Sequence, residues 1–163
     1  SLLLLGGVAL FLSLPFDGCG SKGYWTIQTV DSNGWLGYGP SLAFDSDGNP
    51  AISYADANGD LNYAFYDGTE WNKETVDSDG IVGRYSTSLA FDSDGNPAIS
   101  YVDDTNHDLK YAFYDEDSWS IETIDSNGEV GYLSSLAFDS EGNPAIVYYD
   151  DTNEDIKYAF YTC

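Results

Sequence analysis

The sequence predicts an all-β fold made of three tandem copies of one four-stranded antiparallel unit, and three observations support this. The 163-residue chain contains 14 Tyr, 8 Phe and 4 Trp, and aromatic side chains pack well on the pleated surface of a sheet. Its 17 Gly recur with Asp or Asn in short turn clusters. Finally, Leu42, Leu89 and Leu136 recur at an interval of 47 residues, which sets the size of the unit.

Three sequence blocks carry the repeat. The first runs from Ser41 to Tyr54, recurs unchanged from Ser88 to Tyr101, and recurs with two substitutions from Ser135 to Tyr148. The second is a Tyr-Ala-Phe-Tyr block at 61–67, 109–115 and 156–161. The third is a Trp-containing block at 25–31, 71–77 and 119–125. Self-similarity over this length predicts a repeat architecture for nearly the whole chain.

The middle copy shows how each unit divides into strands. Short apolar runs bounded by turn-forming residues predict four strands, with the Trp strand first, at 71–76, 88–91, 98–101 and 109–114. Pro97 stands at the head of the third strand, where its missing N–H costs little.

These strands are apolar on both faces. Tyr111 and Phe113 point to one face of their strand, and Ala112 and Tyr114 point to the other. A sheet with one face in water would alternate apolar with polar residues instead. Sheets packed between two neighbours need two apolar faces, and a repeat of this length suits the four-stranded blades of a β-propeller. A β-solenoid or a stack of sheets is the main alternative.

The block from Ser41 to Tyr54, with the Tyr-Ala-Phe block that follows it, resembles the propeller-type repeats of secreted bacterial and archaeal proteins. The hairpin Ser46-Asp-Gly-Asn is also similar, more loosely, to the Asp-box of sialidase-type propellers, but it lacks the aromatic residue that normally ends such a box. The resemblance implies a propeller fold and a secreted context, and it carries over no catalytic residue.

Three blades do not easily close a ring, because propellers typically have four to eight. An unpaired strand edge is therefore expected at each end of the repeats, and natural proteins cover such edges. We expect the three blades to be part of a larger ring in a longer protein. Two chains that complete a six-bladed ring, or copies stacked end to end, are the alternatives.

The N-terminal residues predict export. Residues 1–14 are nearly all apolar, too short for a comfortable membrane span, and typical of the hydrophobic region of a secretory signal. Residues 16–20 resemble a bacterial lipobox with Cys19 as the lipidated residue, although Phe16 and Asp17 depart from that pattern. We expect a secreted protein or a cell-surface or periplasmic lipoprotein. Its expected segments are a signal peptide or lipoprotein anchor at 1–22 and a three-blade segment at 23–163, with repeats at about 25–67, 71–115 and 119–161.

The charge of the chain restricts its partners. With 28 acidic and 5 basic residues, the formal net charge is −23. Such a field repels phosphate backbones and anionic headgroups, which excludes nucleic acid and leaves the N-terminal anchor as the only expected membrane contact. Cations, basic proteins and neutral sugars stay suitable partners.

No residue set predicts catalysis. The carboxylates recur at equivalent turn positions in every repeat, whereas a glycosidase pair should break that symmetry. The only arginine, Arg84, cannot form the arginine cluster that a sialidase needs for its substrate. The only histidine, His107, occupies a turn position that carries Gly59 and Glu154 in the other copies, as an exposed turn residue would. We expect no enzyme.

A calcium site is the only cofactor prediction. In each copy, the turn that follows the Ser-Leu-Ala-Phe strand places oxygen ligands at alternate positions, as calcium loops do. These residues are Asp45, Asp47, Asn49, Asp92, Asp94, Asn96, Asp139, Glu141 and Asn143. They also suit a tight hairpin turn in which Asp accepts backbone N–H bonds, and we favour that explanation.

Aromatic residues in the loops form the remaining candidate site. Tyr38, Tyr85 and Tyr132 lie at equivalent positions, and Trp35 occurs in the first copy alone. Aromatic faces near carboxylates suit neutral sugars, although such side chains also fill blade interfaces. We therefore predict a non-catalytic extracellular or cell-surface propeller module that binds a glycan or a protein. The alternatives are a propeller glycoside hydrolase whose active site lies in other blades, and a structural repeat that assembles through its open edges.

Overall fold

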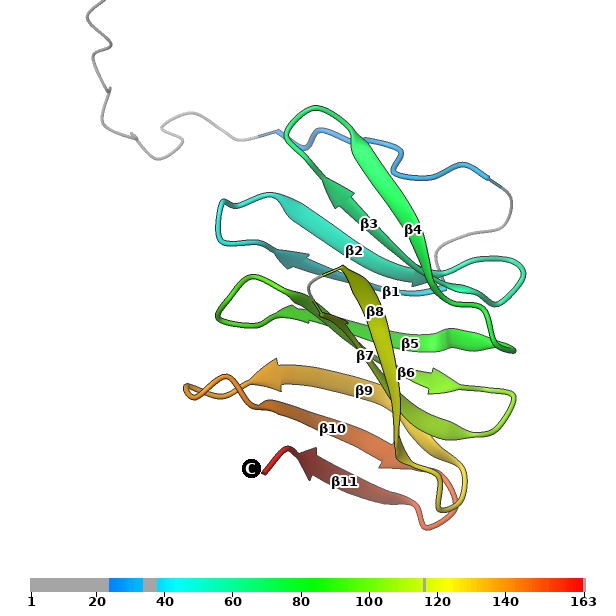
Figure 1. Cartoon of the computed structure of the whole chain (residues 1–163). Helices are drawn as coiled ribbons and strands as arrows, with labels where there is room; N and C mark the ends of the chain where they lie inside the picture. The colour runs from blue at the N-terminus through cyan, green and yellow to red at the C-terminus, as the bar shows by residue number, and fades with distance from the viewer. Residues whose placement is uncertain (1–23, 34–37, 116, 163) are drawn as a thin grey trace, which may run out of the picture.

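The computed structural model describes residues 24–33, 38–115 and 117–162, and within them it contains three antiparallel sheets and no helix (Figure 1). Blade A consists of β1 (Tyr38–Phe44), β2 (Pro50–Ala55), β3 (Leu61–Tyr66) and β4 (Trp71–Asp77). Blade B consists of β5 (Val82–Phe91), β6 (Pro97–Asp103), β7 (Asp108–Asp115) and β8 (Ser118–Asp125). Blade C consists of β9 (Val130–Phe138), β10 (Pro144–Asp150) and β11 (Asp155–Phe160).

The three blades stack face to face in chain order, with the first strands β1, β5 and β9 next to one another (Figure 1). Within each blade the strands pair in sequence order as a meander. Consecutive antiparallel meanders with adjacent inner strands are the blades of a β-propeller. The predicted all-β fold is confirmed. In the described part of the chain, no helix is long and apolar enough to span a membrane.

The core lies between the blades, as the two apolar faces of the strands predict. Leu61 of blade A packs with Ile99 and Tyr101 of blade B, and all three side chains are fully buried. Leu109 of blade B packs in the same way against Val130 of blade C. Full burial of one such aliphatic side chain contributes about 1.5–3 kcal/mol, so these contacts stabilise the packing of one blade on the next.

The Trp-containing strands close the blade that precedes them, which corrects the sequence-based grouping that placed them first in each unit. Trp71 lies opposite Tyr66 in the β3–β4 hairpin. The carboxylate of Asp67 closes that hairpin by accepting hydrogen bonds from the backbone N–H groups of Thr69 (2.8 Å) and Glu70 (2.9 Å). A repeat interval fixes the length of a unit but not the point where a sheet begins, so the sequence alone left the grouping open.

Four strands per blade, as predicted, are found in blades A and B, whereas blade C has three within the described residues. Residues 25–30 were also predicted to form a strand, but they pair with no strand in the structure. The predicted signal segment at 1–22, with Cys19, lies outside the described residues.

Candidate functional site

Aromatic and polar side chains from blades B and C meet where β5 and β9 begin, beside the β6–β7 turn. We call this group the B–C cluster; it consists of Arg84, Tyr85, Asp104, His107 and Tyr132. The rings of Tyr85 and Tyr132 lie 5.9 Å apart between centroids, in a tilted arrangement. His107 Nδ1 lies 3.2 Å from the hydroxyl oxygen of Tyr132, which joins the turn of blade B to the first strand of blade C.

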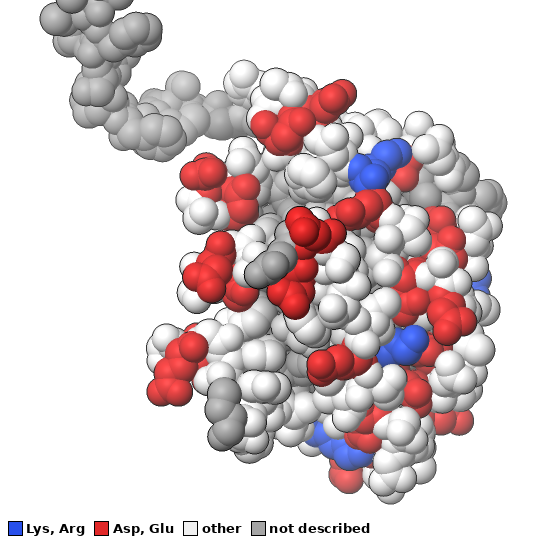
Figure 2. All heavy atoms as spheres, in the orientation of Figure 1, with Lys and Arg blue, Asp and Glu red and all other residues white. Residues whose placement is uncertain are grey.

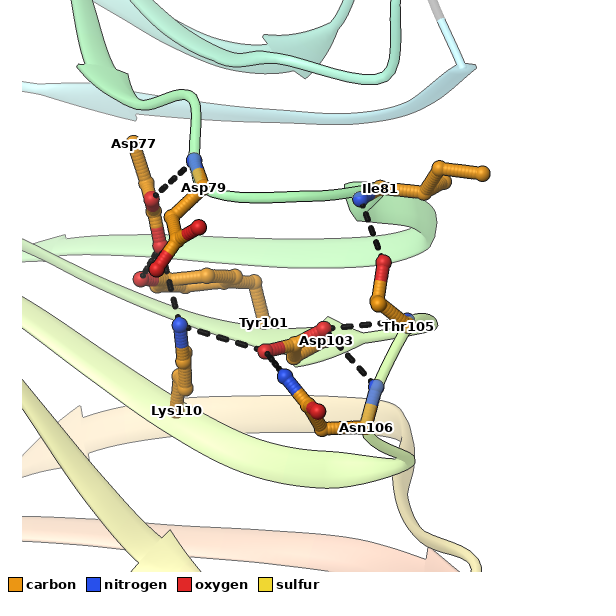
Figure 3. A network of polar contacts seen from close by, with 8 residues as sticks. All are labelled: Asp77, Asp79, Ile81, Tyr101, Asp103, Thr105, Asn106 and Lys110. Atoms are coloured by element: carbon orange, nitrogen blue, oxygen red, sulfur yellow. Dashed lines mark hydrogen bonds and ion pairs between the residues drawn. The ribbon is translucent and has the colours of Figure 1, made fainter.

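A buried carboxylate holds the β6–β7 turn in place (Figure 3). Asp103 is fully buried and accepts hydrogen bonds from the backbone N–H groups of Thr105 (3.0 Å) and Asn106 (3.1 Å). Its other oxygen accepts from Nδ2 of Asn106 (2.9 Å) and forms an ion pair with Lys110 Nζ (3.2 Å). Every oxygen of this charged group therefore has a partner, which is the condition for burying it without a large loss of stability.

The same turn is also fixed to the segment that enters blade B. The hydroxyl oxygen of Thr105 accepts a hydrogen bond from the backbone N–H of Ile81 (2.8 Å), as Figure 3 shows. The backbone N–H of Asp104 donates to the carbonyl oxygen of Ile81 (2.8 Å). These two bonds fix the backbone position of Asp104 at the start of β5, so its carboxylate is held by the fold.

Asp104 is the chemically unusual member of the cluster. Both of its carboxylate oxygens are shielded from water and have no hydrogen-bond partner among the described residues. Burial raises the pKa of Asp104 to about 6, although the charges of Arg84 and His107 act in the opposite direction. Buried polar groups in native proteins almost always have partners, so a shielded carboxylate without a donor indicates a place where a water or ligand donor belongs.

The junction between blades A and B lacks this arrangement. In the first repeat, Ala57 and Gly59 occupy the positions of Asp104 and His107. Tyr38 lies at this junction with the guanidinium of Arg84 5.6 Å from its ring centroid. The described residues therefore hold one cluster with a buried carboxylate, rather than one equal site per blade.

The four predicted ligand-binding residues are thus divided. The structure brings Tyr85 and Tyr132 together, places Tyr38 beside Arg84, and leaves Trp35 outside the described residues. The sequence reasoning missed Asp104 as a site residue, whereas the prediction that His107 is an exposed turn residue is confirmed. The available signal is the departure from repeat symmetry at this turn, where Asp104 and His107 stand at the positions of Ala57 and Gly59.

The nine predicted calcium ligands form hairpin turns. In the first turn, Asp45 accepts hydrogen bonds from the backbone N–H groups of Asp47 (2.9 Å) and Asn49 (2.8 Å) and from Nδ2 of Asn49 (2.9 Å). Asp92 and Asp139 make the same bonds in the other two turns. Among the described residues, no group of three or more His, Cys, Asp or Glu side chains is arranged to hold a metal ion. Calcium binding stays a prediction.

Comparisons with known proteins concern the fold. No protein-family model matches the chain, and no curated protein sequence matches it. The chain is similar to a fucose lectin from Kordia zhangzhouensis, solved in complex with methyl-fucoside, with a TM-score of 0.52 and 17% identity over 76% of this chain and 92% of that chain. It is also similar to AofleA from Arthrobotrys oligospora, with a TM-score of 0.56 and 18% identity over 78% of this chain and 39% of that chain.

A leech intramolecular trans-sialidase also matches, with a TM-score of 0.48 and 22% identity, over 76% of this chain and 23% of that chain. The chain thus spans nearly all of the Kordia lectin and well under half of AofleA. At these identities the likeness to the Kordia and Arthrobotrys proteins is one of fold, and it agrees with the sheet topology. The chain is a set of β-propeller blades.

Proposed function

We propose that the chain is a non-catalytic, carbohydrate-binding propeller module whose sugar site is the B–C cluster. The observation that carries the proposal is the shielded Asp104 carboxylate, which has no donor among the described residues and lies near Tyr132, whose ring packs against that of Tyr85. Because both carboxylate oxygens are shielded, a sugar hydroxyl would donate the missing hydrogen bond after the side chains around Asp104 move aside to admit it. Sugar rings also present C–H faces that pack on aromatic side chains, and Tyr85 is 63% exposed.

The charge of the cluster indicates which sugars suit it. Arg84 supplies donors for sugar oxygens, and the carboxylate of Asp104 supplies acceptors. Because the chain carries a formal net charge of −23, its field disfavours acidic sugars. A neutral sugar with adjacent hydroxyl groups matches both requirements.

Fucose is the first sugar to test. The similar Kordia protein is a fucose lectin solved with methyl-fucoside. In this chain, Leu133 follows Tyr132 and has a left-handed backbone conformation (φ 52°) with its side chain 73% exposed. A bulky apolar residue in that conformation is an outlier, and such backbone strain clusters at functional sites. An exposed apolar side chain at the edge of the cluster would suit the methyl group of a 6-deoxy sugar.

A binding role explains the cluster better than hydrolysis does. Glycoside hydrolysis needs two carboxylates on either side of the bond that is broken. Asp104 is the only carboxylate among the five residues of the cluster; Glu129 and Asp151 also lie near Tyr132, and the adjacent Asp103 is engaged by Lys110 and by its own turn. The proposal includes an extracellular or cell-surface location, which rests on the N-terminal sequence alone.

The proposal is tested by calorimetric titration with methyl-fucoside and with a panel of neutral and acidic monosaccharides. We expect one site per chain, and a loss of affinity of at least tenfold in Tyr132→Ala. Tyr24→Ala is the control, because Tyr24 is 90% exposed and lies outside the cluster. Absence of binding to every sugar, or equal losses in the two variants, would reject the B–C cluster as a sugar site.

A further inference from the structure

An apolar cavity of about 320 Å³ lies at the interface of blades B and C. It is distinct from the B–C cluster, because its lining comes from β7, β8, β10, β11 and the residue that follows β11. Three of its lining residues are decisive: Tyr111, Glu122 and Tyr161.

The equivalent position between blades A and B is filled by a tryptophan. The ring of Trp119 makes edge-on contacts with Tyr63 (5.4 Å between centroids) and Tyr114 (5.5 Å). Its Nε1–H donates to Oε1 of Glu74 at 2.9 Å. By repeat position, Tyr63, Glu74 and Tyr114 correspond to the cavity residues Tyr111, Glu122 and Tyr161. The cavity therefore has the lining of a tryptophan site.

The strand that would supply this tryptophan is not part of blade C. Trp119 belongs to β8, the fourth strand of blade B, whereas blade C ends at β11 within the described residues. The backbone of β11 repeats that of β7, which pairs with β8. One vacant strand position thus accounts for both the open edge of β11 and the cavity beside it.

The Trp-containing segment 25–31, which precedes blade A in the chain, could supply such a strand. Asp31 accepts a hydrogen bond from the hydroxyl of Tyr54 at 2.8 Å. Asp77, at the end of β4, accepts the matching bond from Tyr101 at 2.7 Å, as Figure 3 shows. In addition, Trp71 Nε1 lies 3.4 Å from the side-chain oxygen of Gln28, which repeats the Trp119–Glu74 contact. Residues 25–31 therefore lie where the fourth strand of a preceding blade would lie.

Residues 25–31 belong to none of the three sheets, and their apolar side chains are exposed to solvent. Trp25 is 96% exposed and Ile27 is 93% exposed. The outer faces of the two end blades are bare as well. Leu42 of blade A is 58% exposed and Ile156 of blade C is 74% exposed, whereas their repeat equivalents Leu89 and Leu109 are buried. The exposed faces of blade A and blade C thus correspond to the two surfaces that pack together at the A–B and B–C interfaces.

We propose that two copies of the chain join head to tail into one six-bladed ring, in which residues 25–31 of each copy form the fourth strand of blade C of the other. By analogy with the pairing of β7 and β8, Trp25 lies opposite Tyr161, and Gln28 lies opposite Tyr158. The indole of Trp25 fills the cavity and donates to Glu122. Closed propellers have four to eight blades, and two sets of these three blades make six.

The ring is tested by measuring the mass of the full chain in solution by sedimentation equilibrium. We expect two copies for the wild type, and a dissociation constant at least tenfold higher for Trp25→Ala and for Ile156→Lys. Both residues are exposed in the single chain, so the circular dichroism spectra of the variants should match the wild type. Tyr24→Ala is the matched control and should leave the dimer intact, because Tyr24 precedes the paired segment.

A mixing experiment tests the head-to-tail order. A pair made of one Trp25→Ala chain and one Ile156→Lys chain retains one intact contact, whereas each variant alone has two damaged contacts. We therefore expect the mixture to associate more tightly than either variant alone. A monomeric wild type, an assembly of more than two copies, or a mixture that associates no better than its components would overturn the two-copy ring.

Discussion

Asp104 reduces stability at neutral pH, because its carboxylate is charged there and finds no hydrogen-bond donor in the part of the chain that the structure describes. Burial raises its pKa in the folded chain to about 6, from an ordinary value of 3.8. A pKa raised by folding gives stability that is fully present below the ordinary value and is lost as the pH rises through about 6. Fully buried Asp103 lies next to it and has all its partners, so the two adjacent carboxylates have opposite energetic roles.

Asp104→Asn is therefore expected to raise the free energy of unfolding at pH 8 by about 1 to 2 kcal/mol, after allowance for solvent screening. The amide removes the buried charge and keeps the shape of the side chain. The gain should shrink as the pH is lowered and should be absent at pH 4, where the wild-type carboxyl is largely protonated. Chemical denaturation at both pH values measures this difference, and a variant less stable than the wild type at pH 8 would contradict the account.

At the scale of the strands, the distance between blades is set by close backbone contacts. Gly131, in β9, has φ +91°, and a Cβ built on it would lie 2.8 Å from the Cα of Leu109 in β7. Only glycine allows β9 to approach the neighbouring blade so closely. Gly95, in the β5–β6 hairpin, has a similar φ of +88° but open space around it.

Substitution of these two glycines distinguishes the free-energy cost of backbone strain from that of a steric clash between blades. Gly131→Ala should lower the free energy of unfolding by about 3 kcal/mol, because backbone strain is combined with a steric clash between blades. Gly95→Ala should lower it by about 1 kcal/mol, because backbone strain acts alone. Thermal and denaturant unfolding of the two variants make the comparison. Equal losses would show that the close approach of the blades contributes nothing.

The strands could be predicted because the repeat marks them three times over. Apolar residues on both faces, as in Tyr111 and Ala112, also predicted the packing of each sheet between two neighbours. The grouping of strands could not be predicted, because it depends on which turns are tight hairpins. The site could not be predicted either, since the loss of hydrogen-bond partners at Asp104 follows from the position of the β6–β7 turn against β5.

At the scale of the whole molecule, acidic side chains are scattered over the visible face of all three blades, among uncharged residues and few basic ones (Figure 2). A net charge of −23 on each copy means that two copies repel one another over long distances. The proposed contact between copies is mainly apolar, from Trp25 and Ile156, so screening should favour it.

The dissociation constant of the wild-type dimer should therefore fall several-fold between about 20 mM and 300 mM salt. Sedimentation equilibrium at a series of salt concentrations measures the effect. A dimer that weakens as salt is added would show that attractive ion pairs, rather than apolar contacts, hold the copies together.

Sugar binding and ring formation are separable, because the B–C cluster and the cavity are formed by different residues of the same interface. Arg84, Tyr85 and Tyr132 belong to β5 and β9, whereas Trp25 is proposed to enter between β8 and β11. Trp25→Ala should therefore bind sugar with the affinity of the wild type even where it is monomeric. A failure of one proposal leaves the other to be judged by its own measurement.

Titration of methyl-fucoside into the wild type and Asp104→Asn at pH 7.5 and pH 5 tests most directly whether Asp104 accepts a hydrogen bond from a bound neutral sugar. Protonation of a carboxyl with a pKa of about 6 removes acceptor strength, so wild-type affinity should fall at least fivefold at pH 5. Asp104→Asn should bind weakly and equally at both pH values. An Asp104→Asn variant that binds as tightly as the wild type at pH 7.5 would contradict the account.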